Sequence, residues 1–392
     1  MHTFLLASFF AIQNFCLICH SDIRVLYNES IHNKEGIECI ECHGGNPFID
    51  NIYEAHRKNF KGKIKREEIP SLCSTCHSDP QKMKPYNLPS DQYHLYLNSP
   101  HGKLLQKGNK DVAVCTDCHG THDVLSSDNP KSPAYIKNVP KTCANCHSDA
   151  KLKNKYNFPS DPYKEYMESI HAKSLLLRGN LSSPECTGCH GAHGAAPPGL
   201  GDVNKVCGHC HSKTREYFLE SAHKLSLEKV DSPECSHCHK NHDIEQADIN
   251  MFDGVCKNCH SSDSLAFLAG QKLKTMFLQS QQEIDKAKVL IEKAEKIPIA
   301  VEDYKARLEE GITYLIEAQP VMHTLLEEKV EDLTRKSRSI GEEIQLELYG
   351  KFAQLRVRKI GLIFFWFYLI LTVILIYQYK RFLIKKRNEK NI

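Results

Sequence analysis

The 392-residue sequence has no cysteine outside nine copies of one five-residue pattern, Cys-x-x-Cys-His. The nine copies use all 18 cysteines, so no thiol is left for a separate disulfide, a catalytic nucleophile or an iron–sulfur cluster. A disulfide inside each copy is disfavoured too, because a pair of cysteines three residues apart has poor geometry for a bridge. The copies begin at Cys16, Cys39, Cys73, Cys115, Cys143, Cys186, Cys207, Cys235 and Cys256.

The spacing of the pattern is that of c-type haem attachment, in which each thiol forms a thioether with one haem vinyl group. The histidine directly after the second cysteine is then the proximal iron ligand. Structural zinc also uses cysteine and histidine, but it does not require histidine at this place in every copy. The sequence therefore predicts nine covalently attached haem c groups. The second cysteines are Cys19, Cys42, Cys76, Cys118, Cys146, Cys189, Cys210, Cys238 and Cys259. The proximal histidines are His20, His43, His77, His119, His147, His190, His211, His239 and His260.

Further histidines recur with these motifs, as residues 77–105 and 147–175 show when they are aligned at an offset of 70. Each repeat has one attachment motif, a Ser-x-His, and a second motif that is usually followed by Gly-x-His. Since each iron needs a sixth ligand, recurrence at fixed positions predicts distal ligation. In the fourth repeat Lys240 and Asn241 replace Gly-x. The predicted distal ligands are His32, His101, His122, His171, His193, His223 and His242.

Fewer distal donors are evident than irons. The first repeat lacks Gly-x-His after His43, and His56 is expected to replace it. That gives eight donors for nine irons, and His94 is the candidate for the ninth, with His2 as a weaker one. His209 and His237 lie inside attachment motifs and are expected to be exposed bystanders; His323 is expected to be a packing or surface residue. The alternative is one five-coordinate iron.

These tandem motifs resemble the doubled-motif multihaem cytochromes c, which include class III cytochromes, pentahaem electron carriers and octahaem oxidoreductases. The resemblance covers residues 16–260, about two thirds of the chain. It implies closely stacked haems with two histidine ligands each, at the proximal and distal positions already given.

The expected fold is mostly α, with little regular structure in a compact nonahaem domain at 16–262, where haem rather than side chains fills the interior. After residue 262 the apolar residues recur every three to four positions. Three amphipathic helices are expected within 263–359: one ended by Pro298, a shorter one ended near Pro320, and one from Met322 to Leu355. They form either a bundle packed on itself or on the haem domain, or a stalk or oligomerisation coil.

Residues 360–377 contain no charge and would span roughly 27 Å as a helix, close to the thickness of a bilayer core. A membrane helix is thus expected at 360–379, followed by a basic tail at 380–392. The excess of Lys and Arg in the tail predicts a cytoplasmic C-terminus. Residues 1–15 contain an apolar run with no preceding Lys or Arg. This run is expected to be either a signal-peptide remnant or a short retained helix.

The formal charge of +3 gives no reason to expect nucleic-acid binding, since nine haems would add roughly eighteen propionate charges. The expected function is electron transfer in anaerobic respiration, between a membrane quinol or dehydrogenase partner and a periplasmic or extracellular acceptor. The expected location is the cell membrane, with the haem domain outside and redox proteins, including a quinol-oxidising membrane subunit, as partners. An oligomer through the helical region is left open. The alternative function is an oxidoreductase acting on nitrite, hydroxylamine or sulfur oxyanions at one five-coordinate haem.

Overall fold

A computed structural model describes residues 14–57, 59–158, 161–194, 205–225 and 234–389. The predicted signal-peptide remnant therefore lies almost wholly outside the described residues, as does His2. The chain divides into two units. The first contains Met1–Cys210 and Pro233–Ala247, and the second contains His211–Ser232 and Asp248–Ile392.

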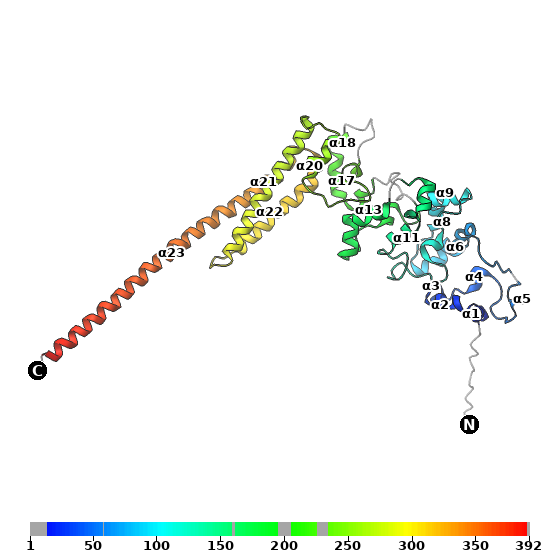
Figure 1. The fold of residues 1–392 in the computed structure, drawn as a ribbon, viewed down its shortest axis with the longest axis horizontal. Coiled ribbons are helices and arrows are strands. Elements are labelled where there is room, and N and C mark those ends of the chain that lie inside the picture. Colours follow the sequence, from blue (N-terminus) through cyan, green and yellow to red (C-terminus); the bar gives the residue numbers. More distant parts are fainter. Residues whose placement is uncertain (1–13, 58, 159–160, 195–204, 226–233, 390–392) are drawn as a thin grey trace, which may run out of the picture. The chain divides into compact units, whose positions relative to one another are not determined.

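The first unit is built of short helical segments joined by loops, and no strand occurs in the residues that the structure describes (Figure 1). The structure is 69% helical, which confirms the mostly α fold. The segments are α1 Phe15–Cys19, α2 Ser21–Glu29, α3 Ile31–Lys34, α4 Cys39–His43, α5 Ile52–Ala55, η1 Arg66–Glu68, α6 Ile69–His77, α7 Pro80–Met83, η2 Lys84–Tyr86, α8 Gln92–Asn98, α9 Pro100–Gln106, α10 Cys115–His119, α11 Val139–His147, α12 Ala150–Tyr156, α13 Pro162–Glu168, α14 Ile170–Ala172, η3 Lys173–Leu177, α15 Cys186–His190, α16 Cys207–Cys210 and α19 Cys235–His239.

Side chains provide little hydrophobic core in the first unit. Its described core is a small cluster of Leu105, Val112 and Val114, with Ile69 and Tyr96 against it. A cluster of this size buries too little apolar surface to order more than two hundred residues. The first unit therefore needs another source of buried apolar surface, and covalently attached haem would supply it.

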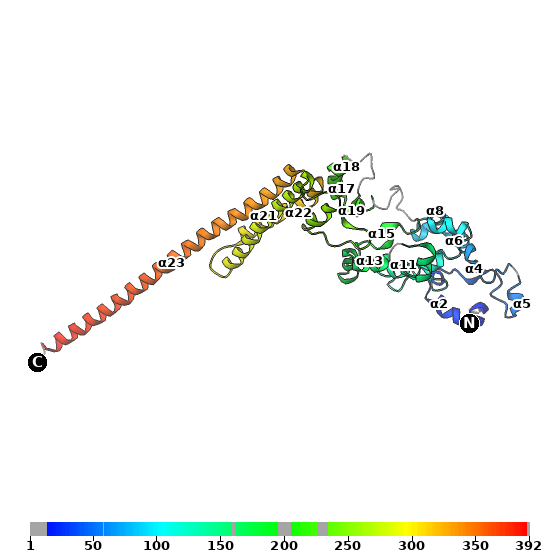
Figure 2. The ribbon, with the colours of Figure 1, turned by 45° about the horizontal axis from the view of Figure 1, so that its top comes forward.

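The second unit is dominated by long helices. Its short segments are α17 Ser212–Leu219, α18 Ala222–Leu225, α20 Met251–Gly254, η5 Val255–Asn258 and η6 Met322–Thr324. Its long helices are α21 Leu265–Ala294, α22 Glu302–Val321 and α23 Glu327–Glu389. Helices α21, α22 and the first half of α23 lie side by side as a three-helix bundle (Figure 1 and Figure 2).

The buried stripe of each long helix makes the core of this bundle. Leu273, Ile284 and Ala287 of α21 belong to one buried cluster with Leu315 of α22 and Ile344 of α23. The backbones of α21 and α23 also approach each other closely at Gly341. A Cβ at this position would lie 2.8 Å from the backbone of Glu283. Of the two arrangements left open for 263–359, the structure shows helices that pack on one another as a bundle.

One boundary differs from that expected from sequence. The third amphipathic helix and the apolar segment after residue 359 form one continuous helix, α23, because no proline or glycine turn separates them. Helix α22 ends at Val321, near Pro320 as expected, and η6 follows. The chain then reverses at Leu325, whose φ of 55° lies in the left-handed region.

The bundle gives a matched pair of leucines on α23. Leu348 is fully buried in the core, whereas Leu346, two residues earlier, is 75% exposed. We expect Leu348→Ala to lower the free energy of unfolding of the bundle by about 2–5 kcal/mol, because it leaves a cavity. Leu346→Ala should change it by less than about 0.5 kcal/mol. Thermal unfolding followed by circular dichroism measures both, and equal effects would contradict the packing.

The second half of α23 leaves the bundle. Its apolar stretch is long enough to cross a membrane, and none of it is buried against the protein. Trp366 and Phe367, for example, are 61% and 68% exposed. A run of exposed large apolar side chains on a single helix is unfavourable in water, so this segment could anchor the chain in a bilayer.

Candidate haem-binding sites

The attachment motifs fold as single helical turns. Each of α4, α10, α15 and α19 begins at the first cysteine of a motif and ends at its histidine. Residues three apart lie on the same side of a helix, so both thiols project from one side of the turn. The two-residue spacer thus presents the cysteines as a pair, with the proximal histidine next in the chain.

The residue after the histidine reverses the chain direction. Gly44, Gly120 and Gly191 have φ values of 70°, 83° and 81°, which glycine adopts at little cost. Lys240, which stands at the same position in the fourth repeat, has a φ of 63°. The Gly-x part of Gly-x-His is therefore a chain reversal, and Lys240 makes the same reversal despite its side chain.

Histidines predicted as proximal and distal ligands face one another in pairs. The ring centroids of each pair lie 6.0–6.3 Å apart. The pairs are His20–His56, His32–His77, His43–His122, His101–His147, His119–His193, His190–His242 and His223–His260.

This separation fits one iron between two imidazoles. Nitrogen–metal distances of about 2 Å, with about 1 Å from each nitrogen to its ring centre, place two ligating rings about 6 Å apart. In contrast, no group of three or more His, Cys, Asp or Glu side chains in the described residues is arranged to hold a metal ion. The donors thus come as facing pairs rather than as the tetrahedral sets of zinc sites.

Six of the seven pairs follow one register along the repeats, whereas His20–His56 lies within the first repeat. The Ser-x-His ligand of one repeat faces the first proximal histidine of the next repeat, as in His32–His77 and His101–His147. The Gly-x-His ligand faces the second proximal histidine of the preceding repeat, as His193 faces His119. Successive repeats are therefore interlocked, each one completing sites in its neighbours.

The serine of Ser-x-His has a role that the sequence analysis did not assign. Ser30, Ser99 and Ser169 are N-caps of α3, α9 and α14, and their hydroxyl groups accept hydrogen bonds from backbone N–H groups of the first turn. Ser221 accepts one from the N–H of Lys224 in the same way. All four serines are buried. An N-cap fixes where the helix starts, and hence which way the histidine two residues later projects.

A tyrosine three residues before the serine ties this segment to the next motif. Its hydroxyl donates a hydrogen bond to the carbonyl two residues before the first cysteine: Tyr27 to Ile37, Tyr96 to Ala113 and Tyr166 to Pro184. Burial raises the pKa of Tyr27 and Tyr96 to about 12, so both remain neutral donors. The spacing from tyrosine to serine could have revealed this contact from sequence.

The facing histidines are held in the form that binds iron. Burial lowers the pKa of His32, His77, His101, His119, His122, His147, His190, His193 and His223. A neutral imidazole keeps a lone pair for the metal. His43 Nδ1 lies 2.9 Å from the carbonyl oxygen of Gly62. A carbonyl oxygen only accepts, so this contact places the proton on Nδ1 and leaves the lone pair on Nε2.

Consecutive motifs of the first unit are neighbours in space. The thiols of Cys73 and Cys115 share a hydrogen bond that raises the pKa of Cys73 above its usual range. Electrostatic contacts link the next motifs, between Cys42 and Cys73 and between Cys118 and Cys143. Other thiol hydrogen bonds join Cys16 to Cys39, Cys143 to Cys186 and Cys207 to Cys235, and a further electrostatic contact joins Cys189 to Cys210. The eight motifs from Cys16 to Cys235 thus follow one another as a row.

Other predicted positions fall outside the seven pairs. His94 is exposed, and its Nε2 lies 3.2 Å from the side-chain nitrogen of Asn98, which also donates to the His94 carbonyl. An amide nitrogen donates, so this contact uses the Nε2 lone pair. His94 therefore does not have the geometry expected of the ninth ligand. His209 and His237 are exposed.

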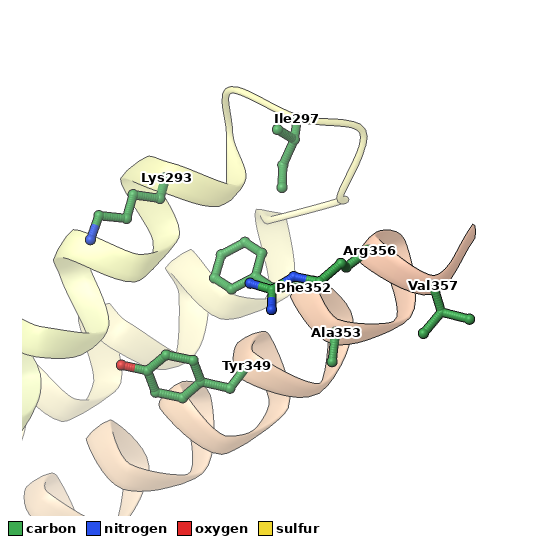
Figure 3. Close-up of a pocket in the computed structure, with 7 residues that line it drawn as sticks. All are labelled: Lys293, Ile297, Tyr349, Phe352, Ala353, Arg356 and Val357. Atoms are coloured by element: carbon green, nitrogen blue, oxygen red, sulfur yellow. The ribbon is translucent and has the colours of Figure 1, made fainter. Parts of the chain in front are cut away.

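A surface hollow lies on the helical bundle. It has a volume of about 590 Å³ and lies between α21 and α23, on the side of the bundle where α23 continues toward residue 360 (Figure 3). No cysteine or histidine lines it. The lining residues are Lys293, Ile297, Tyr349, Phe352, Ala353, Arg356 and Val357.

Comparison with protein families gave one match, to the family described as the doubled CXXCH motif, over residues 179–216. The matched segment contains the motifs that begin at Cys186 and Cys207. No curated protein and no solved structure matched the chain. Residues 179–216 are therefore similar to the doubled CXXCH family, whose motif indicates covalently bound haem c. The helical fold and the facing histidines agree with a multihaem c-type cytochrome.

Proposed function

We propose that this cytochrome holds nine haems and is a membrane-anchored electron carrier. It passes electrons between a membrane quinol or dehydrogenase partner and a periplasmic or extracellular acceptor, in anaerobic respiration. Haem c, when bound, supplies a one-electron iron couple. The observation that carries the proposal is the row of adjacent motifs, together with seven pairs of facing histidines at 6.0–6.3 Å.

Paired histidines suit electron transfer rather than catalysis. Where both axial positions are taken by imidazole, no position on the iron is left for a substrate. In His119–His193 and His43–His122 both rings come from short segments fixed by helical turns and chain reversals, so their spacing is set by the fold. Two histidine ligands also favour a lower potential than a methionine ligand would, which suits anaerobic respiration.

The row of motifs supports transfer along the chain. Hydrogen-bonded thiols join alternate neighbours, such as Cys143 to Cys186, and electrostatic contacts join the others, such as Cys189 to Cys210. Haems attached at such thiols lie close enough for electrons to pass from one to the next. The interlocked register holds the row together, because most distal ligands come from a neighbouring repeat.

The anchor supports a position at the membrane. The exposed apolar stretch of α23 would span the bilayer, and the basic residues after Tyr377 would remain in the cytoplasm. The bundle and the haems would then lie on the outer side, where attachment of haem c takes place. The two arguments for this orientation, from charge and from haem attachment, are independent.

The test is the spin state of the purified cytochrome with its haems attached. We expect nine haems per chain, all low-spin, in low-temperature magnetic circular dichroism and electron paramagnetic resonance spectra, because each iron has two imidazole ligands. A stable fraction near one haem in nine that is high-spin would contradict pure electron transfer. It would favour the alternative, an oxidoreductase acting on nitrite, hydroxylamine or a sulfur oxyanion at one open haem.

A further inference from the structure

The hollow on the helical bundle combines apolar side chains with two basic ones. Lys293, in the last turn of α21, and Arg356, on α23, line it together with Tyr349, Phe352 and Val357 (Figure 3). Tyr349 and Val357 are 58% and 69% exposed. The volume of about 590 Å³ lies within the range of roughly 300–1,000 Å³ that is usual for small-ligand sites. The hollow therefore has the size and the mixed lining that suit an amphipathic ligand.

The charge of the hollow is positive and is not balanced by the protein. None of its lining residues is acidic. Elsewhere in the bundle, Lys305 and Arg307 of α22 each pair with a glutamate. Lys293 and Arg356 have no such partner within the part of the chain that the structure describes. Two unpaired cations beside exposed apolar side chains favour a ligand that is both anionic and amphipathic.

The hollow extends to the level at which α23 would enter a bilayer. Arg356 and Val357 precede the uncharged stretch at 360–377 by four and three residues. On a helix these spacings correspond to about 6 Å and 5 Å. The headgroup layer on each side of a bilayer core is roughly 5–8 Å thick. Because α23 is continuous through this region, the wall of the hollow that Arg356 and Val357 form would lie among lipid headgroups.

A quinol is an alternative amphipathic occupant, but the distance to the haem of the same unit disfavours it. A Cβ at Gly270 would lie 3.9 Å from the sulfur of Cys256, so the ninth attachment motif packs near the start of α21. Lys293 lies 23 residues further along this helix, about 35 Å away. Tunnelling rates fall steeply with distance, so electrons would not pass directly from the hollow to the haem of Cys256. The hollow therefore suits a structural ligand better than a redox substrate.

We propose that the hollow binds the headgroup of an anionic phospholipid from the outer leaflet of the membrane. Its phosphate would contact Arg356 and Lys293, and its glycerol and upper acyl chains would cover Phe352 and Val357. Such a lipid holds the end of the bundle against the membrane surface and so fixes the angle at which α23 leaves it. This inference rests on the proposed membrane anchoring, but the apolar span can anchor the chain whether or not the hollow is used.

The experiment measures lipid binding to the full-length, haem-loaded cytochrome in neutral detergent micelles by native mass spectrometry. Added dioleoylphosphatidylglycerol should bind tightly, with one molecule per chain, and dioleoylphosphatidylcholine should bind more weakly. Lys293→Gln with Arg356→Gln should weaken phosphatidylglycerol binding by roughly tenfold or more, since a hydrogen bond to a charged group contributes at least that factor. Arg358→Gln with Lys359→Gln is the matched control. It removes the same charge close to the span but outside the hollow, and it should change binding by less than about twofold.

A further variant tests the shape of the hollow separately from its charge. Ala353→Trp keeps both cations but fills the hollow, and it should also weaken phosphatidylglycerol binding. Equal binding by the Lys293 and Arg356 double variant and its control, or equal binding of the two lipids, would overturn the proposal and leave the anchoring intact.

Competition experiments distinguish the lipid from other ligands. Glycerol 3-phosphate should compete far more weakly than the lipid, because it lacks acyl chains. Equal competition would assign the hollow to a soluble phosphate ester, and displacement of the lipid by a water-soluble naphthoquinone would assign it to a quinone. Either result would overturn the proposal. A full-length chain that fractionates as a soluble protein would instead contradict the membrane anchoring itself.

Discussion

Replacing Cys115 and Cys118 together with serine should remove one haem of nine and interrupt the row of haems near its middle. Serine forms no thioether, so that haem would be held by its axial ligands His119 and His193 alone. The Cys115 thiol also contacts Cys73, and Cys118 contacts Cys143, so this motif has neighbours on both sides. Intact mass and the absorbance of the denatured haem should both show eight haems.

The same variant should slow transfer along the row much more than it lowers haem content. One missing haem doubles a gap between carriers, and tunnelling rates fall steeply with distance. Reduction of the remaining haems by an external donor should become biphasic, because the haems beyond the gap are reduced more slowly than those on the donor's side. Thr116→Ala, in the spacer of the same motif, is the matched control because it keeps both thiols and His119. A double serine variant that retained nine haems, or stoichiometric zinc in the unmodified protein, would contradict the assignment.

Ending the chain at Lys359 should move the cytochrome from the membrane fraction to the soluble fraction with its haems attached. The deletion removes the exposed apolar part of α23, where each Leu, Ile, Phe or Val contributes about 0.3–0.6 kcal/mol to insertion. The bundle core ends near Leu348 and Phe352, so its packing is kept. Fractionation of cell extracts and the haem absorbance of each fraction measure the outcome.

A shorter deletion separates anchoring from orientation. Removing only residues 380–392 leaves the apolar span and should leave the cytochrome in the membrane. It removes the basic residues that favour a cytoplasmic C-terminus, so some chains should insert the other way and fail to receive haem. Membrane-bound chain with a lowered haem content is the expected result. Retention of the Lys359-terminated chain in the membrane would show that the anchor lies elsewhere.

The attachment sites were predictable because their chemistry is local. Two thiols and a histidine within five residues must lie on one turn of helix, whatever surrounds them, and the structure shows such turns at α4, α10, α15 and α19. The long helices were predictable for a similar reason: the spacing of apolar residues predicted helices ended by Pro298 and near Pro320, and α21 and α22 end at Ala294 and Val321. The continuity of α23 was not predictable, because the spacing of apolar residues does not show that the amphipathic and uncharged parts share one helix.

The pairing of histidines could be predicted only in part from the sequence. Sequence recurrence predicted that His101 and His193 are ligands. It did not show that they face His147 and His119, which belong to neighbouring repeats. His94 was chosen because an iron lacked a donor, and the structure gives its Nε2 to Asn98 instead. His323 was expected to be a packing or surface residue, and the structure places it half-buried in η6, which packs against α17.

The sequence by itself determined the attachment motifs, the helical periodicity and the uncharged span, because each of these depends on residues close together in the chain. The tertiary structure decided which histidines face each other, that three helices form a bundle, and where His323 lies. Those outcomes depend on contacts between distant segments, such as Tyr96 with Ala113 and Ser280 with Thr334, which local spacing does not specify.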